Sequence, residues 1–180
     1  MLDNLSVPYY LGGSWASGAY GPPRSTLDAD IIADLETKHI APLVAALESV
    51  FYIDANMIHE ALQLQRSFNL IHLVYFYKVD IFIVGSSPFK RIQMSRRRQS
   101  SLELEVPDQV YFCSPEDIIL EKLVWYRLGG ETSERQWPDV RGVLKVQQPT
   151  LDYDYLRCWA GELGVADLLA RSMDEAFGEG

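Results

Sequence analysis

The sequence predicts an α/β (α+β) fold, with a mixed β-sheet flanked by helices over residues 1–112 and a helical C-terminal portion over residues 113–180 packed on it. Three observations lead to this prediction. In the first part, short stretches rich in aromatic and β-branched residues alternate with amphipathic stretches. From residue 114 onward, apolar residues recur at helical spacing. Apolar residues make up 48% of the 180 residues, which is enough to bury a core. The alternative is that both parts form one continuous domain.

Strands and helices are expected to alternate in the first part of the chain. Residues 9–11 form an apolar run that ends in Gly12-Gly13-Ser14, and residues 15–20 can form a short helix before the following Gly-Pro-Pro stops it. Apolar and polar residues alternate over 28–35, which is typical of a strand. Helices are expected at 37–50, capped by Thr37, and at 55–65, with 89–99 on a helix or an ordered loop. Further strands are expected at 51–53, 68–72, 75–84, 102–105 and 110–112.

The second part is expected to consist of helices. Ser114 followed by Pro115 is typical of a helix start, because serine caps free N–H groups and proline fits the first helical position. This helix is expected to end at Gly129-Gly130. Three more helices are expected over 134–146, 152–163 and 165–177.

The charge of the chain argues against a general nucleic-acid binder. Asp and Glu number 25 against 16 Lys and Arg, which gives a net charge of −9, so most of the surface repels a phosphate backbone. A polynucleotide would have to meet a local basic patch. The dense positive segment is residues 90–98, and we interpret it as a solvated basic face that offsets neighbouring acids rather than as an RNA contact.

The cysteines and the N-terminus bear on the compartment. Cys113 and Cys158 are too few for a disulfide framework, and each lies in an apolar stretch that suits a packed, reduced thiol. The first residues lack the charged and apolar regions of an export signal, and no stretch approaches the roughly 20 apolar residues that span a bilayer. A cytoplasmic protein with no membrane contact is therefore expected.

Gly12-Gly13-Ser14 lies where a strand is expected to turn into a helix. The N–H groups at the start of a helix have no partner within it and lie at its positive end, so they suit the oxygens of a triphosphate. Glycine permits close approach of the phosphate, and the serine hydroxyl adds a donor. A glycine pair is also common in ordinary tight turns, so this motif alone does not decide between the two interpretations.

Three aspartates form the second candidate element. Asp28 and Asp30 are two residues apart on an expected strand, so their side chains lie on one face with Cα atoms about 7 Å apart. They either belong to a solvated strand end or share a divalent cation, since carboxylates beside phosphate commonly hold Mg²⁺. Asp80 lies in an apolar strand where an unpaired charge would be costly. We therefore expect a metal ion or a basic side chain beside it.

These elements together resemble the nucleotidyltransferase superfamily, the group with the fold of DNA polymerase beta. The resemblance rests on Gly12-Gly13-Ser14, thirteen intervening residues, Asp28-Ala29-Asp30 between apolar residues, and Asp80 in a later apolar strand. The spacing falls within the range of the superfamily, and the three elements occur in its order.

A narrower resemblance points to the AbiEii and MenT toxin-like nucleotidyltransferases. Arg24-Ser25-Thr26 before Asp28 resembles one of their motifs, and Ser114-Pro115-Glu116-Asp117 with Lys122, and Arg135 with Asp139, resemble another. Both likenesses together extend over roughly residues 11–144. They imply a toxin–antitoxin setting with a cognate antitoxin as partner.

The resemblance implies a Mg²⁺-dependent enzyme that transfers a nucleoside monophosphate from a nucleoside triphosphate (NTP) to an acceptor. The roles that follow from it are a metal site at Asp28, Asp30 and Asp80, with Asp80 sharing a second metal or acting as the base. Lys122 would join these three as a catalytic group, and the nucleotide would be held by Gly12, Gly13, Ser14, Arg24, Thr26 and Asp139. The acceptor stays open among RNA, protein and small molecules, since little chain remains for an acceptor-binding domain. The alternative is a nucleotide-binding or protein-interaction module that keeps the fold without transfer.

Overall fold

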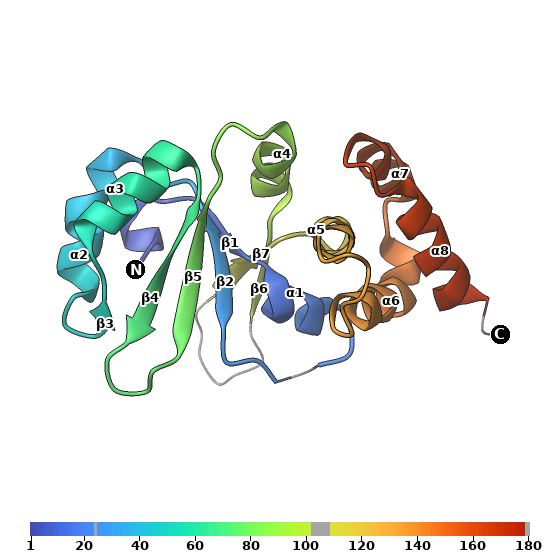
Figure 1. The fold of residues 1–180 in the computed structure, drawn as a ribbon, viewed down its shortest axis with the longest axis horizontal. Helices are drawn as coiled ribbons and strands as arrows, with labels where there is room; N and C mark the ends of the chain where they lie inside the picture. The colour runs from blue at the N-terminus through green and yellow to red at the C-terminus, as the bar shows by residue number, and fades with distance from the viewer. Residues whose placement is uncertain (24, 102–108, 179–180) are drawn as a thin grey trace. The chain divides into compact units, whose positions relative to one another are not determined.

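The chain folds into two units, one built around a β-sheet and one built from helices (Figure 1). The computed structural model describes residues 1–23, 25–101 and 109–178. Unit 1 comprises Met1–Gly12 and Thr26–Phe112, and unit 2 comprises Gly13–Ser25 and Cys113–Gly180. Unit 1 thus ends at Phe112, and the chain continues in unit 2 from Cys113. The segment Gly13–Ser25, however, belongs with the helices rather than with the sheet.

The described part of unit 1 contains a seven-stranded mixed sheet in the order β3-β4-β5-β2-β1-β7-β6. Its strands are β1 (Tyr9–Leu11), β2 (Ala29–Ala33), β3 (Phe51–Tyr52), β4 (Ser67–His72), β5 (Lys78–Ile83), β6 (Arg98–Ser101) and β7 (Gln109–Phe112). β2 runs parallel to β5, and β1 runs parallel to β7, whereas the other neighbours are antiparallel. The mixed sheet predicted from the sequence is therefore confirmed.

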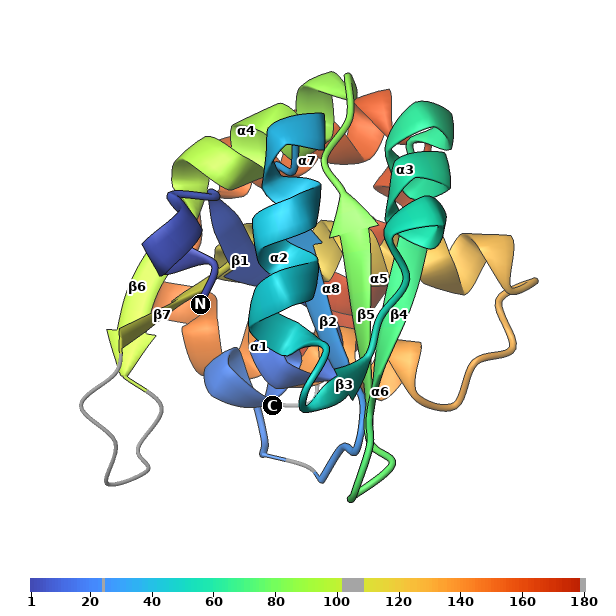
Figure 2. The same cartoon turned by 90° about the vertical axis from the view of Figure 1, so that its left-hand side faces the viewer.

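Helices cover both faces of this sheet. They are η1 (Asp3–Leu5), η2 (Thr37–His39), α2 (Ile40–Leu47), α3 (Ala55–Leu64) and α4 (Pro88–Arg96). α2 and α3 lie on one side of the sheet, where Leu43 and Ile58 are fully buried among the apolar residues of the strands (Figures 1 and 2). α4 lies on the other side, where the hydroxyl of Tyr10 donates to Gln93 at 3.0 Å. The hydrophobic core therefore lies between the sheet and α2 and α3, and Tyr10 is buried on the opposite face.

Some predicted boundaries in unit 1 were wrong. The expected helix over 37–50 starts with a 3-10 turn, and Glu36 rather than Thr37 caps it: the Glu36 side chain accepts from the His39 backbone, and the Glu36 N–H donates to His39 Nδ1 at 3.0 Å. Residues 75–77 form a loop before β5 instead of its first part. The expected strand over 102–105 lies outside the described residues.

Unit 2 consists of helices. They are α1 (Gly13–Tyr20), α5 (Pro115–Leu128), α6 (Gln136–Gln147), η3 (Gln148–Thr150), α7 (Tyr153–Glu162) and α8 (Ala166–Phe177). The cap predicted at Ser114 is confirmed, because its hydroxyl accepts from the Asp117 N–H at 3.2 Å and Pro115 follows in the first turn. The turn after α1 approaches α6 closely: a Cβ placed on Gly142 would lie 2.6 Å from Cδ of Pro22. Glycine is therefore required there.

The two cysteines differ in their surroundings. Cys113 is buried, and burial raises the pKa of its thiol well above the ordinary value, so it stays protonated and packed. Cys158 is exposed on α7, so the prediction of a packed thiol was wrong there. Within 1–23, 25–101 and 109–178, no helix has the length and apolar character needed to cross a membrane.

Candidate functional site

Asp30 and Asp80 face each other across two neighbouring strands of unit 1. β2 and β5 run in parallel register, and these two residues are Cα partners in it. Asp80 is also the register partner of Asn69 in β4. On the other side, the N–H of Gly12 donates to the carbonyl of Asp30 at 2.9 Å. Asn69, Asp80 and Asp30 thus form a line across three strands, which we name the carboxylate row.

The carboxylate row projects from the sheet face opposite the hydrophobic core. The neighbours of the aspartates in sequence, Ile31 and Ile81, pack in that core. Successive side chains of a strand point to opposite faces, so the aspartates must point away from it. Both aspartates are partly buried. The local alternation of the sequence therefore fixes the direction of the row.

A lysine that the sequence analysis did not identify accompanies this row. Nζ of Lys78 lies 2.7 Å from Oδ2 of Asp80, with side chains 41% and 21% exposed. The hydrogen bond and the charge of Asp80 raise the pKa of Lys78, and the charges of Asp28 and Asp30 add to this effect. One ammonium group thus senses all three aspartates. The expected cation beside Asp80 is present, in the form of a basic side chain.

Asp28 and Thr26 lie just before β2. Asp28 is exposed, and the Thr26 hydroxyl donates to its backbone carbonyl at 3.1 Å. This bond orders the backbone that leads into β2. Arg24, expected to contact the nucleotide, lies outside the described residues.

The side chains around the carboxylate row meet part of what Mg²⁺ requires. Within the described parts of the chain, no group of three or more His, Cys, Asp or Glu side chains is arranged to hold a metal ion. Mg²⁺ is usually held by one or two carboxylates, waters and the phosphates of a substrate. The facing pair Asp30 and Asp80 meets that smaller requirement, and the Lys78 ammonium shows that this place attracts positive charge.

The remaining predicted site residues lie in unit 2. Gly13 starts α1 with φ of 51°, a left-handed conformation that glycine adopts without strain. Ser14 follows it, and the Ser14 carbonyl lies 3.2 Å from the hydroxyl of Ser17. The strand–turn–helix expected at Gly12-Gly13-Ser14 is therefore present, with Gly12 at the end of unit 1 and Gly13 at the start of unit 2.

Lys122 and Asp139 contact each other within unit 2. Nζ of Lys122 lies 2.7 Å from Oδ2 of Asp139, and the two side chains are 5% and 12% exposed. Nζ also lies 3.1 Å from Oε1 of Gln136, and the Ser17 hydroxyl lies 3.2 Å from the same Asp139 oxygen. The pair joins α5 to α6, with a further contact to α1. It therefore has a structural role whether or not a nucleotide contacts it.

The acidic start of α5 also has structural partners. Glu116 and Asp117 are fully buried. Oε1 of Glu116 accepts from the N–H of Asp152 at 3.1 Å, and Oδ1 of Asp117 accepts from the Tyr155 hydroxyl at 2.6 Å. These hydrogen bonds connect the start of α7 to the start of α5.

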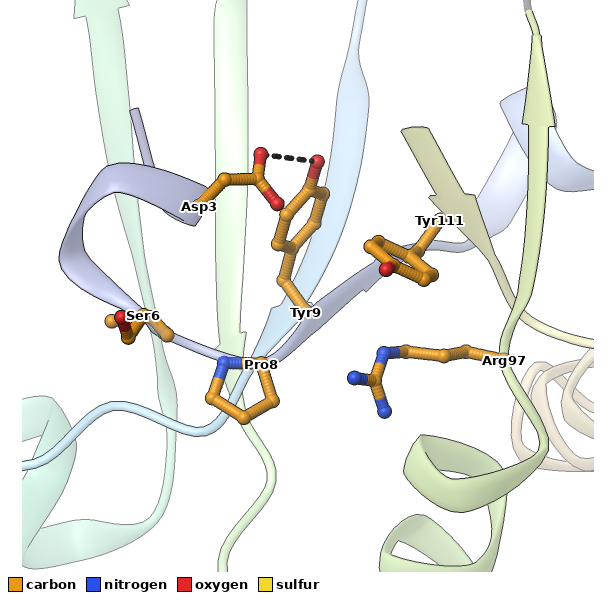
Figure 3. Close-up of a pocket in the computed structure, with 7 residues that line it drawn as sticks. Asp3, Ser6, Pro8, Tyr9, Arg97 and Tyr111 are labelled. Atoms are coloured by element: carbon orange, nitrogen blue, oxygen red, sulfur yellow. Dashed lines mark hydrogen bonds between the residues drawn. The ribbon is translucent and has the colours of Figure 1, made fainter. Parts of the chain in front are cut away.

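A separate pocket of about 200 Å³ lies in unit 1 and contains none of the predicted site residues (Figure 3). The Arg97 guanidinium lies 4.9 Å from the centre of the Tyr111 ring and donates to the Met94 carbonyl at 2.6 Å. The Tyr9 hydroxyl donates to Asp3 at 3.1 Å on the other side of the pocket. Arg91, from the same basic segment, pairs with Asp34 at 2.7 Å. Arg91 thus balances the charge of Asp34, whereas Arg97 contacts a ring and a backbone carbonyl, and the interpretation of residues 90–98 as a basic face that offsets acids stays a prediction.

Sequence reasoning missed Lys78 and Asn69. Both have a signal in the alternation of their strands: Lys78 lies two residues before Asp80, and Asn69 lies between the buried Phe68 and Leu70. The row itself could not be foreseen, because residues 30, 69 and 80 meet only through strand register.

Comparison with solved structures shows proteins of the same fold. An antigenic nucleotidyltransferase-like protein from Paracoccidioides brasiliensis superposes with a TM-score of 0.56 at 17% identity, over 99% of this chain and 92% of that one. ANT(2")-Ia in complex with adenylyl-2"-tobramycin gives a TM-score of 0.58 at 13% identity, over 90% of each chain. The lincosamide antibiotic adenylyltransferase LnuA, bound to lincomycin, gives 0.52 at 14% identity, over 81% of this chain and 90% of that one.

Sequence comparison adds no relative. No protein-family profile matches the chain, and no curated protein matches it. The likeness is therefore one of architecture, and this chain has a mixed α/β fold consistent with that of solved nucleotidyltransferases.

Proposed function

We propose that this chain is a Mg²⁺-dependent nucleotidyltransferase that transfers a nucleoside monophosphate from NTP to an acceptor hydroxyl. The observation that carries the proposal is the register of Asp30 with Asp80, on the face opposite α2 and α3, in a sheet whose architecture is similar to that of solved nucleotidyltransferases. Asp28, just before the same strand, contributes to the same electrostatic field. The Asp30 and Asp80 carboxylates, with the charge of Asp28 acting on the same lysine, favour a divalent cation and its polyphosphate partner.

Each group has a distinct part in this proposal. Asp28 and Asp30 hold the metal that binds the triphosphate, and Asp80 either shares a second metal or accepts the proton of the acceptor hydroxyl. When bound, Mg²⁺ supplies positive charge that neutralises the phosphoryl oxygens. Asn69 is available to orient the carboxylate of Asp80 through its amide. The N–H of Gly12 already donates to the Asp30 carbonyl, so the part of the Gly12-Gly13-Ser14 turn in phosphate binding is proposed at the positive start of α1.

The acceptor is proposed to be a small molecule. Among the proteins of similar fold, the adenylyltransferase LnuA is bound to lincomycin, and ANT(2")-Ia is in complex with adenylyl-2"-tobramycin. The net charge of −9 disfavours a polyanionic acceptor such as RNA. A toxin–antitoxin role rests on the narrower resemblance around residues 24–28 and 114–139. Growth arrest on expression that a neighbouring gene product relieves would support that role.

A transfer assay tests the proposal. The protein is incubated with α-labelled ATP, GTP, CTP and UTP, Mg²⁺ and hydroxyl-bearing acceptors, and the labelled product is separated. Asp30→Asn is expected to lower the rate by about a hundredfold or more, because a metal ligand is lost. The matched control is Asp154→Asn, an exposed aspartate of α7, which should leave the rate unchanged. Equal rates for wild type and Asp30→Asn would refute the assignment.

One observation favours a second candidate, a nucleotide-binding module without transfer. The Lys78 ammonium already neutralises Asp80 at 2.7 Å, so the row can exist without a metal. In this case NTP binds with the same affinity in Mg²⁺ and in EDTA, and no acceptor is labelled.

A further inference from the structure

A pocket whose walls include Asp3, Tyr9, Arg97 and Tyr111 lies in unit 1, on the face of the sheet turned away from the carboxylate row (Figure 3). The Tyr9 side chain belongs to the hydrophobic core between the sheet and α2 and α3, and Tyr111 packs against that core. The carboxylate row projects from the opposite face. We name this cavity the Arg97 pocket. A ligand bound in it occupies a different place from the proposed metal and nucleotide site.

Arg97 brings a positive charge into this pocket. Its half-buried side chain extends from the start of β6 into the cavity (Figure 3). Nη1 donates to the Met94 carbonyl at 2.6 Å, and the guanidinium lies 4.9 Å from the centre of the Tyr111 ring. Nε is shielded from water and has no hydrogen-bond partner among the described residues. These contacts hold the guanidinium in place, but they neither neutralise its charge nor use most of its five N–H donors.

Asp3 brings the opposite charge to the same pocket. Oδ2 of Asp3 accepts from the Tyr9 hydroxyl at 3.1 Å, which orients the carboxylate. In the part of the chain that the structure describes, Asp3 and Arg97 form no ion pair with each other, although both line one cavity. Two opposite charges that are held apart in this way are complementary to a ligand that carries both charges itself.

The Arg97 pocket admits only a small ligand. Its volume is about 200 Å³, whereas sites for drug-sized ligands usually measure roughly 300–1,000 Å³. A nucleoside triphosphate is therefore too large for it. An α-amino acid with a hydrogen bond of about 2.8 Å at each end spans roughly 8 Å between a guanidinium and a carboxylate. This span is comparable with the diameter of a sphere of the same volume, which is about 7 Å.

We propose that the Arg97 pocket binds a free α-amino acid, with the amino-acid carboxylate on the Arg97 guanidinium and its ammonium group on the Asp3 carboxylate. A planar guanidinium suits a carboxylate because it can donate two parallel hydrogen bonds. Pro8 and the tyrosine rings offer apolar surface to the side chain of the ligand. A simple anion is repelled by Asp3 and a simple cation by Arg97, so the site favours a zwitterion over both. This binding function goes beyond the proposed nucleotidyl transfer and does not depend on it.

NMR titration of the full chain with matched probes tests the proposal. Glycine, L-leucine and L-phenylalanine carry both charges and differ in side chain. At least one of them is expected to shift the amide signals of Asp3, Tyr9, Arg97 and Tyr111 saturably. The methyl ester of the tightest-binding amino acid lacks the carboxylate, and its N-acetyl derivative lacks the ammonium group. Each derivative should bind at least about tenfold more weakly, because one charge-assisted contact is lost.

Two variants identify which group of the ligand contacts which residue. In Asp3→Asn, the amino acid and its N-acetyl derivative should bind alike, because the ammonium group has lost its partner. In Arg97→Gln, the amino acid and its methyl ester should bind alike, because the carboxylate has lost its partner. A purely structural role for either residue does not produce this pairing of variant and probe. The controls are Asp154→Asn and Arg157→Gln, which alter an exposed ion pair on α7 and should bind as wild type does.

The proposal would be overturned if none of the three amino acids shifted these signals, or if wild type bound either derivative as tightly as the amino acid. Inorganic phosphate that shifted the same signals as strongly would also overturn it, since the pocket would then be a simple anion site. Unchanged binding in both Asp3→Asn and Arg97→Gln would place the amino acid elsewhere. Asp3 is exposed, so Asp3→Asn is expected to fold and keeps the test decisive even if Arg97→Gln unfolds.

Discussion

Asp80 and Lys78 lie on the same face of β5, and their ion pair remains partly open to water. Such pairs contribute only about 0–1 kcal/mol to folding. The sheet therefore does not depend on the pair for its stability, and a divalent ion can displace the lysine at little cost. The three nearby carboxylates repel one another whenever that positive charge is removed. Lys78 thus acts as the counter-ion of the carboxylate row.

Lys78→Met is expected to tighten binding of Mg²⁺, because the metal no longer competes with the ammonium for Asp80. Isothermal titration with MgATP should give an affinity higher by roughly two- to fivefold, the equivalent of about 0.5–1 kcal/mol. Lys38→Met is the control, since Lys38 forms a comparable exposed pair with Glu36 at 2.9 Å. Weaker binding in Lys78→Met would instead mean that the lysine contacts the nucleotide.

Among helices, α5 and α6 are joined by a buried pair rather than by apolar contacts alone. Lys122 and Asp139 are almost fully shielded from water, unlike Lys78 and Asp80. Removing one partner of such a pair leaves an uncompensated charge, whereas replacing both can be nearly neutral. The difference in stability between the single and the double replacement therefore distinguishes a lysine with a structural role from one with only a catalytic role.

Lys122→Met should lower the free energy of unfolding by about 3–5 kcal/mol, and the double variant with Asp139→Leu should recover most of this loss. Urea denaturation followed by circular dichroism measures both. If the single variant unfolds within about 0.5 kcal/mol of wild type, the pair does not hold α5 on α6.

A second contact joins α6 to α8 and depends on pH. Oε2 of Glu175 accepts from the indole N–H of Trp137 at 2.8 Å, and Oε1 accepts from Arg171 at 3.1 Å. These hydrogen bonds lower the pKa of Glu175 below its ordinary value of 4.5, with the indole as the larger cause. The ionised form is thus favoured in the folded state. Its contribution to stability is complete above pH 4.5 and is lost as the pH falls through the lowered pKa.

Glu175→Gln should therefore reduce the acid sensitivity of the protein. Thermal unfolding measured between about pH 6 and pH 3 should show a smaller fall in Tm for this variant than for wild type. Glu60→Gln, at an exposed site on α3, is the control and should follow wild type. An equal fall in Tm with pH for Glu175→Gln and wild type would show that Glu175 does not contribute to acid sensitivity.

Elements with strong local patterns were predictable, and those formed by pairing were not. The alternation around Asp30 and the cap at Ser114 are local signals, and both elements are present. β6 was missed, because its arginine and polar residues become a strand only by pairing with β7. The helical segment is capped by Glu36 because the Glu36 N–H donates to the side chain of His39. The sequence did not reveal this hydrogen bond, since the next residue, Thr37, is itself a common capping residue.

For the molecule as a whole, the membership of the segment Gly13–Ser25 in unit 2 could not be inferred from the sequence. Its strand–turn–helix signal is local, whereas its attachment to the helices depends on the close approach of Pro22 to Gly142, far away in sequence. The candidate site likewise depends on contacts between residues that are far apart in the sequence. Asp28, Asp30 and Asp80 were identified as residues, yet only the sheet order brings β2 beside β5.

The proposed nucleotidyl transfer requires that the carboxylate row binds metal and nucleotide together. Isothermal titration of a non-hydrolysable ATP analogue with Mg²⁺ into wild type and Asp80→Asn tests this directly. Asp34→Asn serves as control, since Asp34 follows β2 and pairs with Arg91. We predict saturable binding to wild type and Asp34→Asn that requires Mg²⁺, and binding at least about tenfold weaker in Asp80→Asn with unchanged Tm. Equal affinity for all three proteins, or affinity that persists in EDTA, would contradict it.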